Sequence, residues 1–163
     1  SDIDFAKAVV EATLIRTFNN VHRITIRGEA GVIKTNSFDE VPTSLRFYAG
    51  GDKSVRGFDY REISPTAEVI DPETGELIVD SIGGKYLATS SVEYAYQVAD
   101  NWRVAAFVDA GTATNDTSTT LTYSVGPGVH WLSPIGPVRL YVARGFAPDE
   151  NTWQLHILLG PEL

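Results

Sequence analysis

Hydrophobic and polar residues alternate strictly along several segments of the chain. From Val92 to Val98, valine and tyrosine occupy every second position, and Glu93, Ala95 and Gln97 lie between them. Because successive side chains of a β-strand point to opposite faces, this period of two predicts a strand with one apolar and one polar face. The same pattern recurs in Ile3–Phe18, His22–Thr35, Trp102–Thr112, Leu121–Leu132, Val138–Phe146 and Trp153–Leu159.

The connections between these predicted strands alternate between short and long. The short ones are Asn19–Val21, Ala99–Asn101 and Ser133–Pro137, and they are rich in turn-forming residues. The long ones are Asn36–Lys85, Ala113–Thr120 and Ala147–Thr152. This asymmetry is typical of an outer-membrane β-barrel, in which tight periplasmic turns alternate with longer outside loops.

The predicted fold is therefore all-β: a fragment of an antiparallel transmembrane β-barrel with about seven up-and-down strands. A soluble β-sandwich is the alternative, since alternation alone fits both folds. Bacterial barrels have even strand numbers, so we expect at least one strand of the barrel to lie outside residues 1–163. The open edges of such a fragment would close on each other, pair with another copy, or pair with strands outside it.

Aromatic residues at the ends of predicted strands support the barrel. Trp102 and Trp131 lie beside short turns, whereas Phe146 and Trp153 flank a long connection. All four belong to the apolar face, as expected for the aromatic girdles at membrane interfaces. Tryptophans that cap the core of a soluble protein are the alternative.

Composition excludes several other classes of protein. No window approaches the roughly 18 to 20 consecutive apolar residues of a membrane-spanning helix, so a helical membrane protein is excluded. The formal net charge of −8 argues against a nucleic-acid partner, which requires a clustered positive face. The absence of cysteine excludes disulfides and thiolate metal sites. No signal peptide is visible at Ser1, as expected of a mature chain or of a fragment.

The long connection at about 36–85 carries the most informative motif. A loop of this length in a compact protein is usually functional or disordered, and this one contains many aromatic residues. Its run Val55, Arg56, Gly57 and Phe58 resembles a signature of the outer-membrane insertase superfamily, whose members assemble or secrete proteins through a barrel. The resemblance implies that this run forms the tip of a loop folded back into the barrel lumen.

A second superfamily element resembles Phe107-Val108-Asp109-Ala110-Gly111. Strand parity independently places Phe107 and Asp109 on the inward face, and Glu93 faces inward on the preceding strand. The resemblance implies that Arg56 pairs with Asp109 and Glu93, and a guanidinium can hold a carboxylate through two hydrogen bonds where lysine offers a point charge. The plainer alternative is a surface arginine and an exposed aspartate.

The end of the chain resembles a narrower group, the TamA-like subunits of the translocation and assembly module. The resemblance rests on the run from Leu158 to Leu163 and on the glycine- and proline-rich runs 126–129 and 133–137. Gly160 and Pro161 cannot continue a strand ladder, since proline donates no hydrogen bond. The last strand is therefore expected to form a weak seam that serves as a lateral gate.

The resemblance also implies partners and a mechanism. Client outer-membrane proteins or autotransporters would add strands at the seam, within outer-membrane lipid and with an inner-membrane-anchored partner subunit. The resemblance further implies that residues 1–163 are the C-terminal part of the barrel, and that N-terminal strands and periplasmic domains would precede them. A two-partner secretion transporter or a passive outer-membrane pore is the alternative function.

Enzymatic chemistry and cofactors are not predicted. His22, His130 and His156 show no metal-ligand spacing, and no Gly-x-Ser-x-Gly run occurs. Lumen-facing histidines are more often polar wall residues. The segment Asp71–Glu76 is predicted to be a hairpin turn, with calcium binding as the weaker alternative.

Overall fold

The computed structural model describes residues 4–116, 120–148 and 150–160. Seven strands of these ranges form one sheet: β1 (Phe5–Phe18), β2 (His22–Thr35), β5 (Tyr86–Ala99), β6 (Trp102–Thr114), β7 (Thr122–Ser133), β8 (Gly136–Phe146) and β9 (Asn151–Leu159). The connection from β2 to β5 contains the 3-10 helices η1 (Phe38–Glu40) and η2 (Thr43–Leu45) and the hairpin strands β3 (Thr66–Ile70) and β4 (Leu77–Ser81). No helix of the described residues is long and apolar enough to cross a membrane.

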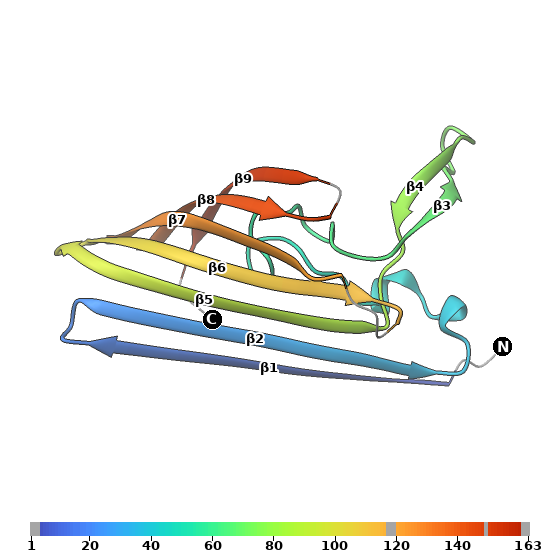
Figure 1. Ribbon diagram of the computed structural model, residues 1–163, viewed down its shortest axis with the longest axis horizontal. Coiled ribbons are helices and arrows are strands. Elements are labelled where there is room, and N and C mark those ends of the chain that lie inside the picture. The colour runs from blue at the N-terminus through green and yellow to red at the C-terminus, as the bar shows by residue number, and fades with distance from the viewer. Residues whose placement is uncertain (1–3, 117–119, 149, 161–163) are drawn as a thin grey trace.

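The seven-stranded sheet has the order β1-β2-β5-β6-β7-β8-β9, and each strand is antiparallel to the next. It is strongly curved, and the connection between β2 and β5 runs along its concave side (Figure 1). Strands β1 and β9 lie at the two edges and, within the described residues, do not pair with each other. The predicted all-β, antiparallel, up-and-down arrangement is confirmed, and the sheet remains open.

Short turns gather at one end of this sheet, here the short-turn end, and long connections at the other, the long-loop end (Figure 1). The turn between β1 and β2 contains Asn19 and Asn20, both with positive φ (49° and 60°). Two consecutive left-handed residues are what a tight hairpin requires, and asparagine tolerates this conformation best after glycine.

Strand ends differ from the predicted ones where proline is involved. Strand β8 begins at Gly136, so Pro137 pairs with Leu132 and the predicted turn 133–137 shortens. Proline is tolerated there because it occupies the start of the strand. Inside β7, Pro127 interrupts the register between β7 and β8, which passes from Val125 to Gly128, since proline has no N–H to donate.

The two faces of the sheet have inverted polarity. Val104 and Val108 on the convex face are 44% and 53% exposed, whereas Glu93 and Asp109 on the concave face are 6% and 0% exposed. A water-soluble sheet would bury its valines and expose its carboxylates. The observed arrangement is that of a barrel wall, which presents apolar side chains to lipid and polar ones to the lumen.

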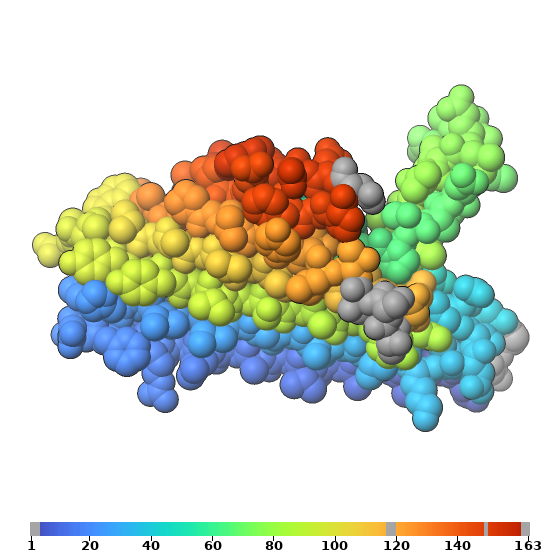
Figure 2. Space-filling model, viewed as in Figure 1, coloured from blue at the N-terminus to red at the C-terminus, as the bar shows by residue number. Residues whose placement is uncertain are grey.

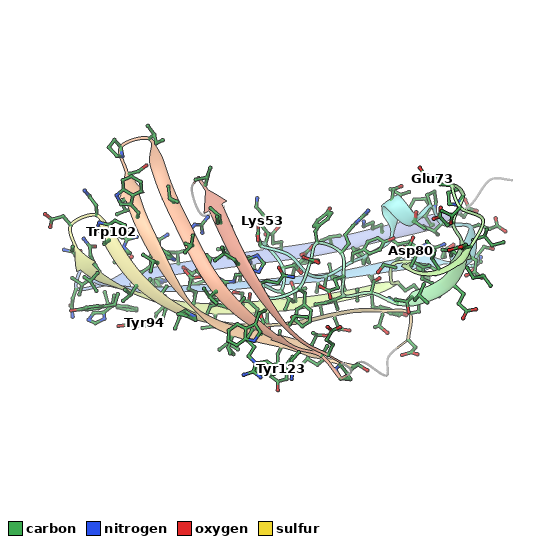
Figure 3. All side chains as sticks on the ribbon, turned by 90° about the horizontal axis from the view of Figure 1, so that it is seen from above. Lys53, Glu73, Asp80, Tyr94, Trp102 and Tyr123 are labelled. Atoms are coloured by element: carbon green, nitrogen blue, oxygen red, sulfur yellow. The ribbon has the colours of Figure 1, made fainter. Side chains whose placement is uncertain are left out.

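Aromatic residues mark both ends of the convex face. Trp102 and Trp131 stack at the short-turn end with ring centroids 5.9 Å apart. Tyr123 and Phe146 stack 5.0 Å apart toward the long-loop end. Figure 3 places Trp102 at the short-turn end and Tyr123 on the outer side of the sheet. These positions match the predicted interfacial girdles.

The hairpin of β3 and β4 projects from the body of the molecule at the long-loop end (Figure 2). Its strands pair antiparallel from Thr66 opposite Ser81 to Ile70 opposite Leu77. The turn is closed by Asp71, whose carboxylate accepts hydrogen bonds from the Glu73 N–H (2.8 Å) and the Thr74 hydroxyl (2.9 Å). The hairpin turn predicted at Asp71–Glu76 is confirmed.

Candidate functional site

The connection between β2 and β5 is attached to the concave face before it reaches its tip. Phe47 forms an antiparallel bridge with Gly84, and Ala49 forms one with Ile63. Phe47 and Ala49 also pack into a buried cluster with wall residues Ile33, Leu87 and Ala113. This packing directs the segment 50–59 into the concavity.

Glycines shape this segment into a compact turn. Gly50, Gly51 and Gly57 have φ values of 103°, 97° and 94°, a region that other residues rarely adopt. The Gly51 N–H donates to the Phe58 carbonyl (3.1 Å), which closes the turn. The loop tip, defined here as residues 54–58, thus lies within a closed turn.

Arg56 makes a two-pronged contact with Asp109 of β6. Its Nε donates to Oδ2 and its Nη2 to Oδ1, both at 2.8 Å. The Arg56 backbone N–H also donates to Oδ2, at 3.0 Å. The backbone N–H and the guanidinium of Arg56 thus bind the same carboxylate, a geometry that a lysine could not reproduce.

Strand β5 supplies further partners for Arg56. Its Nη1 donates to Glu93 Oε2 at 2.6 Å, and its Nη2 donates to the Ser91 hydroxyl at 3.1 Å. The Ser91 hydroxyl in turn donates to Asp109 Oδ1 at 2.6 Å. Only 4% of Arg56 is exposed, so one buried cation is balanced by two buried carboxylates.

Aromatic rings complete the enclosure of the guanidinium. Its carbon lies 3.6 Å from the ring centroid of Phe107 and 4.6 Å from that of Tyr141. Burial opposes the charge, but hydrogen bonds and charges of Asp109 and Glu93 outweigh it and raise the pKa of Arg56 above its ordinary value. The guanidinium therefore stays charged at this buried position.

Gly57 connects the loop tip to β9. Its N–H donates to His156 Nε2 at 2.8 Å, and its carbonyl accepts from the Thr152 hydroxyl. Because Nε2 is an acceptor here, Nδ1 carries the ring proton and faces Asp52. The tip is bonded to β5, β6 and β9 together.

Recesses in the wall receive the apolar side chains of the tip. Val55 is fully buried against Gly111, where an added Cβ would lie 2.7 Å from Val55 Cγ2. The ring of Phe58 covers Gly145 of β8 in the same way, also at 2.7 Å. Phe107 covers Gly126 within the wall. Gly111 therefore accommodates Val55 of the loop because it has no side chain.

The structure thus brings together the predicted site residues Val55, Arg56, Gly57, Phe58, Glu93, Phe107, Asp109 and Gly111. Gly160 lies apart from them, after β9, with φ of 109° and its N–H bonded to the Pro137 carbonyl (2.9 Å). Pro161 lies outside the described residues. The seam at Gly160 and Pro161 stays a prediction.

Several contributors were not predicted from the sequence. His130 lies 3.3 Å from Glu93 Oε1 and 2.9 Å from the Tyr141 hydroxyl, so it supports the second carboxylate. The sequence predicts His130 and His156 as polar wall residues, and nothing in it distinguishes Ser91. Strand parity places Ser91 and His156 on the inward face, but only the register across five strands brings them to the tip. No group of three or more possible metal ligands occurs in the described ranges.

Comparison with known proteins identifies the family. The Omp85 superfamily domain matches residues 1–160. The chain belongs to the Omp85 superfamily. It is a segment of a bacterial outer-membrane β-barrel, as the alternating loops and the inverted faces predict.

Two curated relatives of this Omp85 chain are outer membrane protein assembly factors named BamA. The protein from Nitratidesulfovibrio vulgaris is 35% identical over 157 residues, which cover 92% of this chain and 19% of the relative. The protein from Neisseria meningitidis serogroup B is 28% identical, covering 98% of this chain and 24% of the relative. The chain therefore spans about a fifth to a quarter of the length of these relatives.

A solved structure has the same fold. The crystal structure of BamA from Haemophilus ducreyi lacking POTRA domains 1-3 superimposes with a TM-score of 0.73 at 23% identity, over 94% of this chain and 34% of that chain. The predicted superfamily is confirmed by these comparisons. The narrower TamA-like resemblance stays a prediction, because both of these curated relatives are named BamA.

Proposed function

We propose that this Omp85 chain is the C-terminal barrel segment of an outer-membrane protein assembly and insertion factor. The observation that carries the proposal is the buried attachment of Arg56 to Asp109 and Glu93, which holds a long loop inside the barrel wall. The names of the curated relatives support the same role. A two-partner secretion transporter or a passive pore would share the loop-tip arginine, so client assembly is the measurement that separates these alternatives.

The proposed mechanism uses strand addition. A client strand would pair with the free edge of β9, and main-chain hydrogen bonds would replace unpaired groups there. Strand β9 has 9 residues, whereas the other six strands of the sheet have 11 to 14. Because a short strand forms few ladder bonds, its edge would open at low cost. No covalent chemistry is involved.

The role proposed for Arg56 is positional. The loop tip would keep the lumen side of β9 in place while its edge exchanges partners. Removing one member of the buried cluster leaves an uncompensated charge, which costs more than the intact pair contributes. Loss of Arg56 or Asp109 should therefore release the tip rather than shift it slightly.

A finer version of the proposal follows the resemblance at the chain end. A TamA-like factor would assemble autotransporters together with an inner-membrane-anchored partner subunit, using Gly160 and Pro161 to weaken the seam. The rival reading is a two-partner secretion transporter. Client proteins with and without autotransporter barrels would separate these versions in the same assay.

The central experiment uses the full-length parent protein reconstituted in lipid vesicles, with folding of a client barrel followed by protease protection. Arg56→Ala and Asp109→Ala should each slow client assembly by at least about tenfold. The double variant should assemble clients no more slowly than the slower single variant, because the two substitutions remove the same contact. Arg61→Ala is the matched control, since Arg61 stacks on Tyr48 and Tyr60 of the same loop. The buried contact of Arg56 with Asp109 and Glu93 is called here the loop anchor. Normal client assembly by Arg56→Ala, by Asp109→Ala and by the double variant would exclude its proposed role.

A separate test addresses the seam. A disulfide that joins β9 near Leu159 to the first strand of the intact barrel should stop client assembly, and reduction should restore it. A disulfide between β8 and β9 at Leu140 and Ile157, which already face each other, is the control. Unchanged assembly by the locked seam would exclude gating at β9 and leave the anchor intact as a structural element.

A further inference from the structure

Charged residues are distributed unequally between the two faces of the sheet. Strand register places Glu11, Glu29, Glu93 and Asp109 on the concave face. The lipid-facing side of the described strands carries no carboxylate and three cations, namely Arg16, Lys34 and Arg144. This partition occurs in a chain whose formal net charge is −8. The membrane-facing surface is therefore complementary to anionic groups.

Arg144 is the cation of these three that lies beside two aromatic rings. It lies on β8 two residues before the strand ends at Phe146, where β8 meets a long connection. Its neighbours in register are Val125 on β7 and Trp153 on β9. The guanidinium carbon lies 5.1 Å from the ring centroid of Phe146 and 5.4 Å from that of Trp153.

Within the part of the chain that the structure describes, the donors of this guanidinium have no hydrogen-bond acceptor. Arg144 is exposed, and within residues 4–116, 120–148 and 150–160 its recorded contacts are these two aromatic rings. A cation facing lipid is costly at the bilayer midplane, and the cost falls to a small value near the interface. Arginine reaches that interface by extending its stem along apolar neighbours. At the interface, its planar guanidinium is available to an anionic acceptor.

We propose that Arg144, framed by Phe146, Trp153 and Tyr123, binds the phosphate of a membrane lipid in the leaflet at the long-loop end. The planar fork of arginine matches two phosphate oxygens. The aromatic rings sit at headgroup depth and hold the guanidinium in place. Tyr123, which stacks on Phe146, and Trp153 add a hydroxyl and an indole N–H on the same side of the sheet.

The test measures lipid retention by the full-length parent protein. Native mass spectrometry of the detergent-solubilised protein is titrated with phosphatidic acid, which carries an exposed phosphate, and with diacylglycerol, which carries none. Arg144→Gln should weaken phosphatidic acid binding about fivefold. The affinity of Arg144→Lys should lie between that of the unsubstituted protein and that of Arg144→Gln. Diacylglycerol binding should not change.

Lys53→Gln is the matched control because it removes one positive charge elsewhere. Lys53 is an exposed residue of the lumen loop, and Figure 3 shows it on the opposite side of the sheet from Tyr123. The proposed site would be overturned if Lys53→Gln and Arg144→Gln weakened phosphatidic acid binding equally, or if Arg144→Gln did not weaken it. Displacement of phosphatidic acid by millimolar inorganic phosphate would instead identify a free anion as the ligand and overturn the lipid assignment.

Discussion

Asp109 offers the sharpest perturbation of the loop anchor. Its side chain is fully buried and accepts hydrogen bonds from the Arg56 N–H, Nε and Nη2 and from the Ser91 hydroxyl. Asp109→Asn keeps the size and shape of the side chain. It removes the negative charge and turns one acceptor into an amide group that faces the donors of Arg56.

The cost follows from what remains around Arg56. Breaking a buried ion pair costs about 3–5 kcal/mol, because an uncompensated charge is left behind. Glu93 still accepts from Nη1 at 2.6 Å, and the asparagine oxygen keeps part of the contact. These remaining partners place the loss at the lower end of that range, about 3 kcal/mol.

Amide hydrogen exchange in the full-length parent protein measures this loss locally. The Arg56 and Gly57 amides donate inside the site, so their exchange reports opening of the tip. A fall of about 3 kcal/mol corresponds to exchange about 150-fold faster. Asp59→Asn is the matched control, since Asp59 accepts from Gln154 Nε2 at 3.1 Å at an exposed position and should change exchange less than about fivefold. Similar exchange in the two variants would refute the anchor.

The glycine recess and the histidine contact lead to two further predictions. Gly111→Ala should lower the stability of the seated tip by about 1–3 kcal/mol, because the new Cβ meets Val55, whereas Gly28→Ala has its nearest neighbour at 3.8 Å and should be tolerated. Thermal unfolding of both variants checks this, and equal melting points would contradict it. His156→Phe should leave the Gly57 N–H without an acceptor and speed its exchange by about tenfold to a hundredfold, whereas His156→Gln should retain an acceptor. A Gly57 amide that exchanges alike in both would exclude the contact.

Local patterns were sufficient to predict the wall. Alternation between Val92 and Val98 sets the two faces of β5, and the same period places Asp109 inward on β6. A one-residue shift would reverse every side chain, so the pattern specifies orientation strongly. The pairing of Arg56 with Asp109 and Glu93 required the superfamily resemblance as well, because nothing local connects residues 53 and 37 positions apart.

The remaining members of the site depend on long-range register. Thr152 and His156 reach Gly57 only because β9 pairs with β8, β8 with β7, and the sheet curves over the loop. No single segment encodes that curvature. The recess at Gly145 is similar, since its role appears only when Phe58 is seated on it. Sequence parity could place these residues inside, but it could not say what they meet.

The loop tip joins distant parts of the sheet, and this has a consequence for β9. Arg56 is bonded to β5 and β6, while its neighbour Gly57 is bonded to Thr152 and His156 of β9. Among the described strands, β9 pairs only with β8, so the tip supplies its second line of support. A change that releases Arg56 therefore also loosens the inward side of β9. Anchor and seam variants should consequently be non-additive in client assembly, because the same short strand receives both effects.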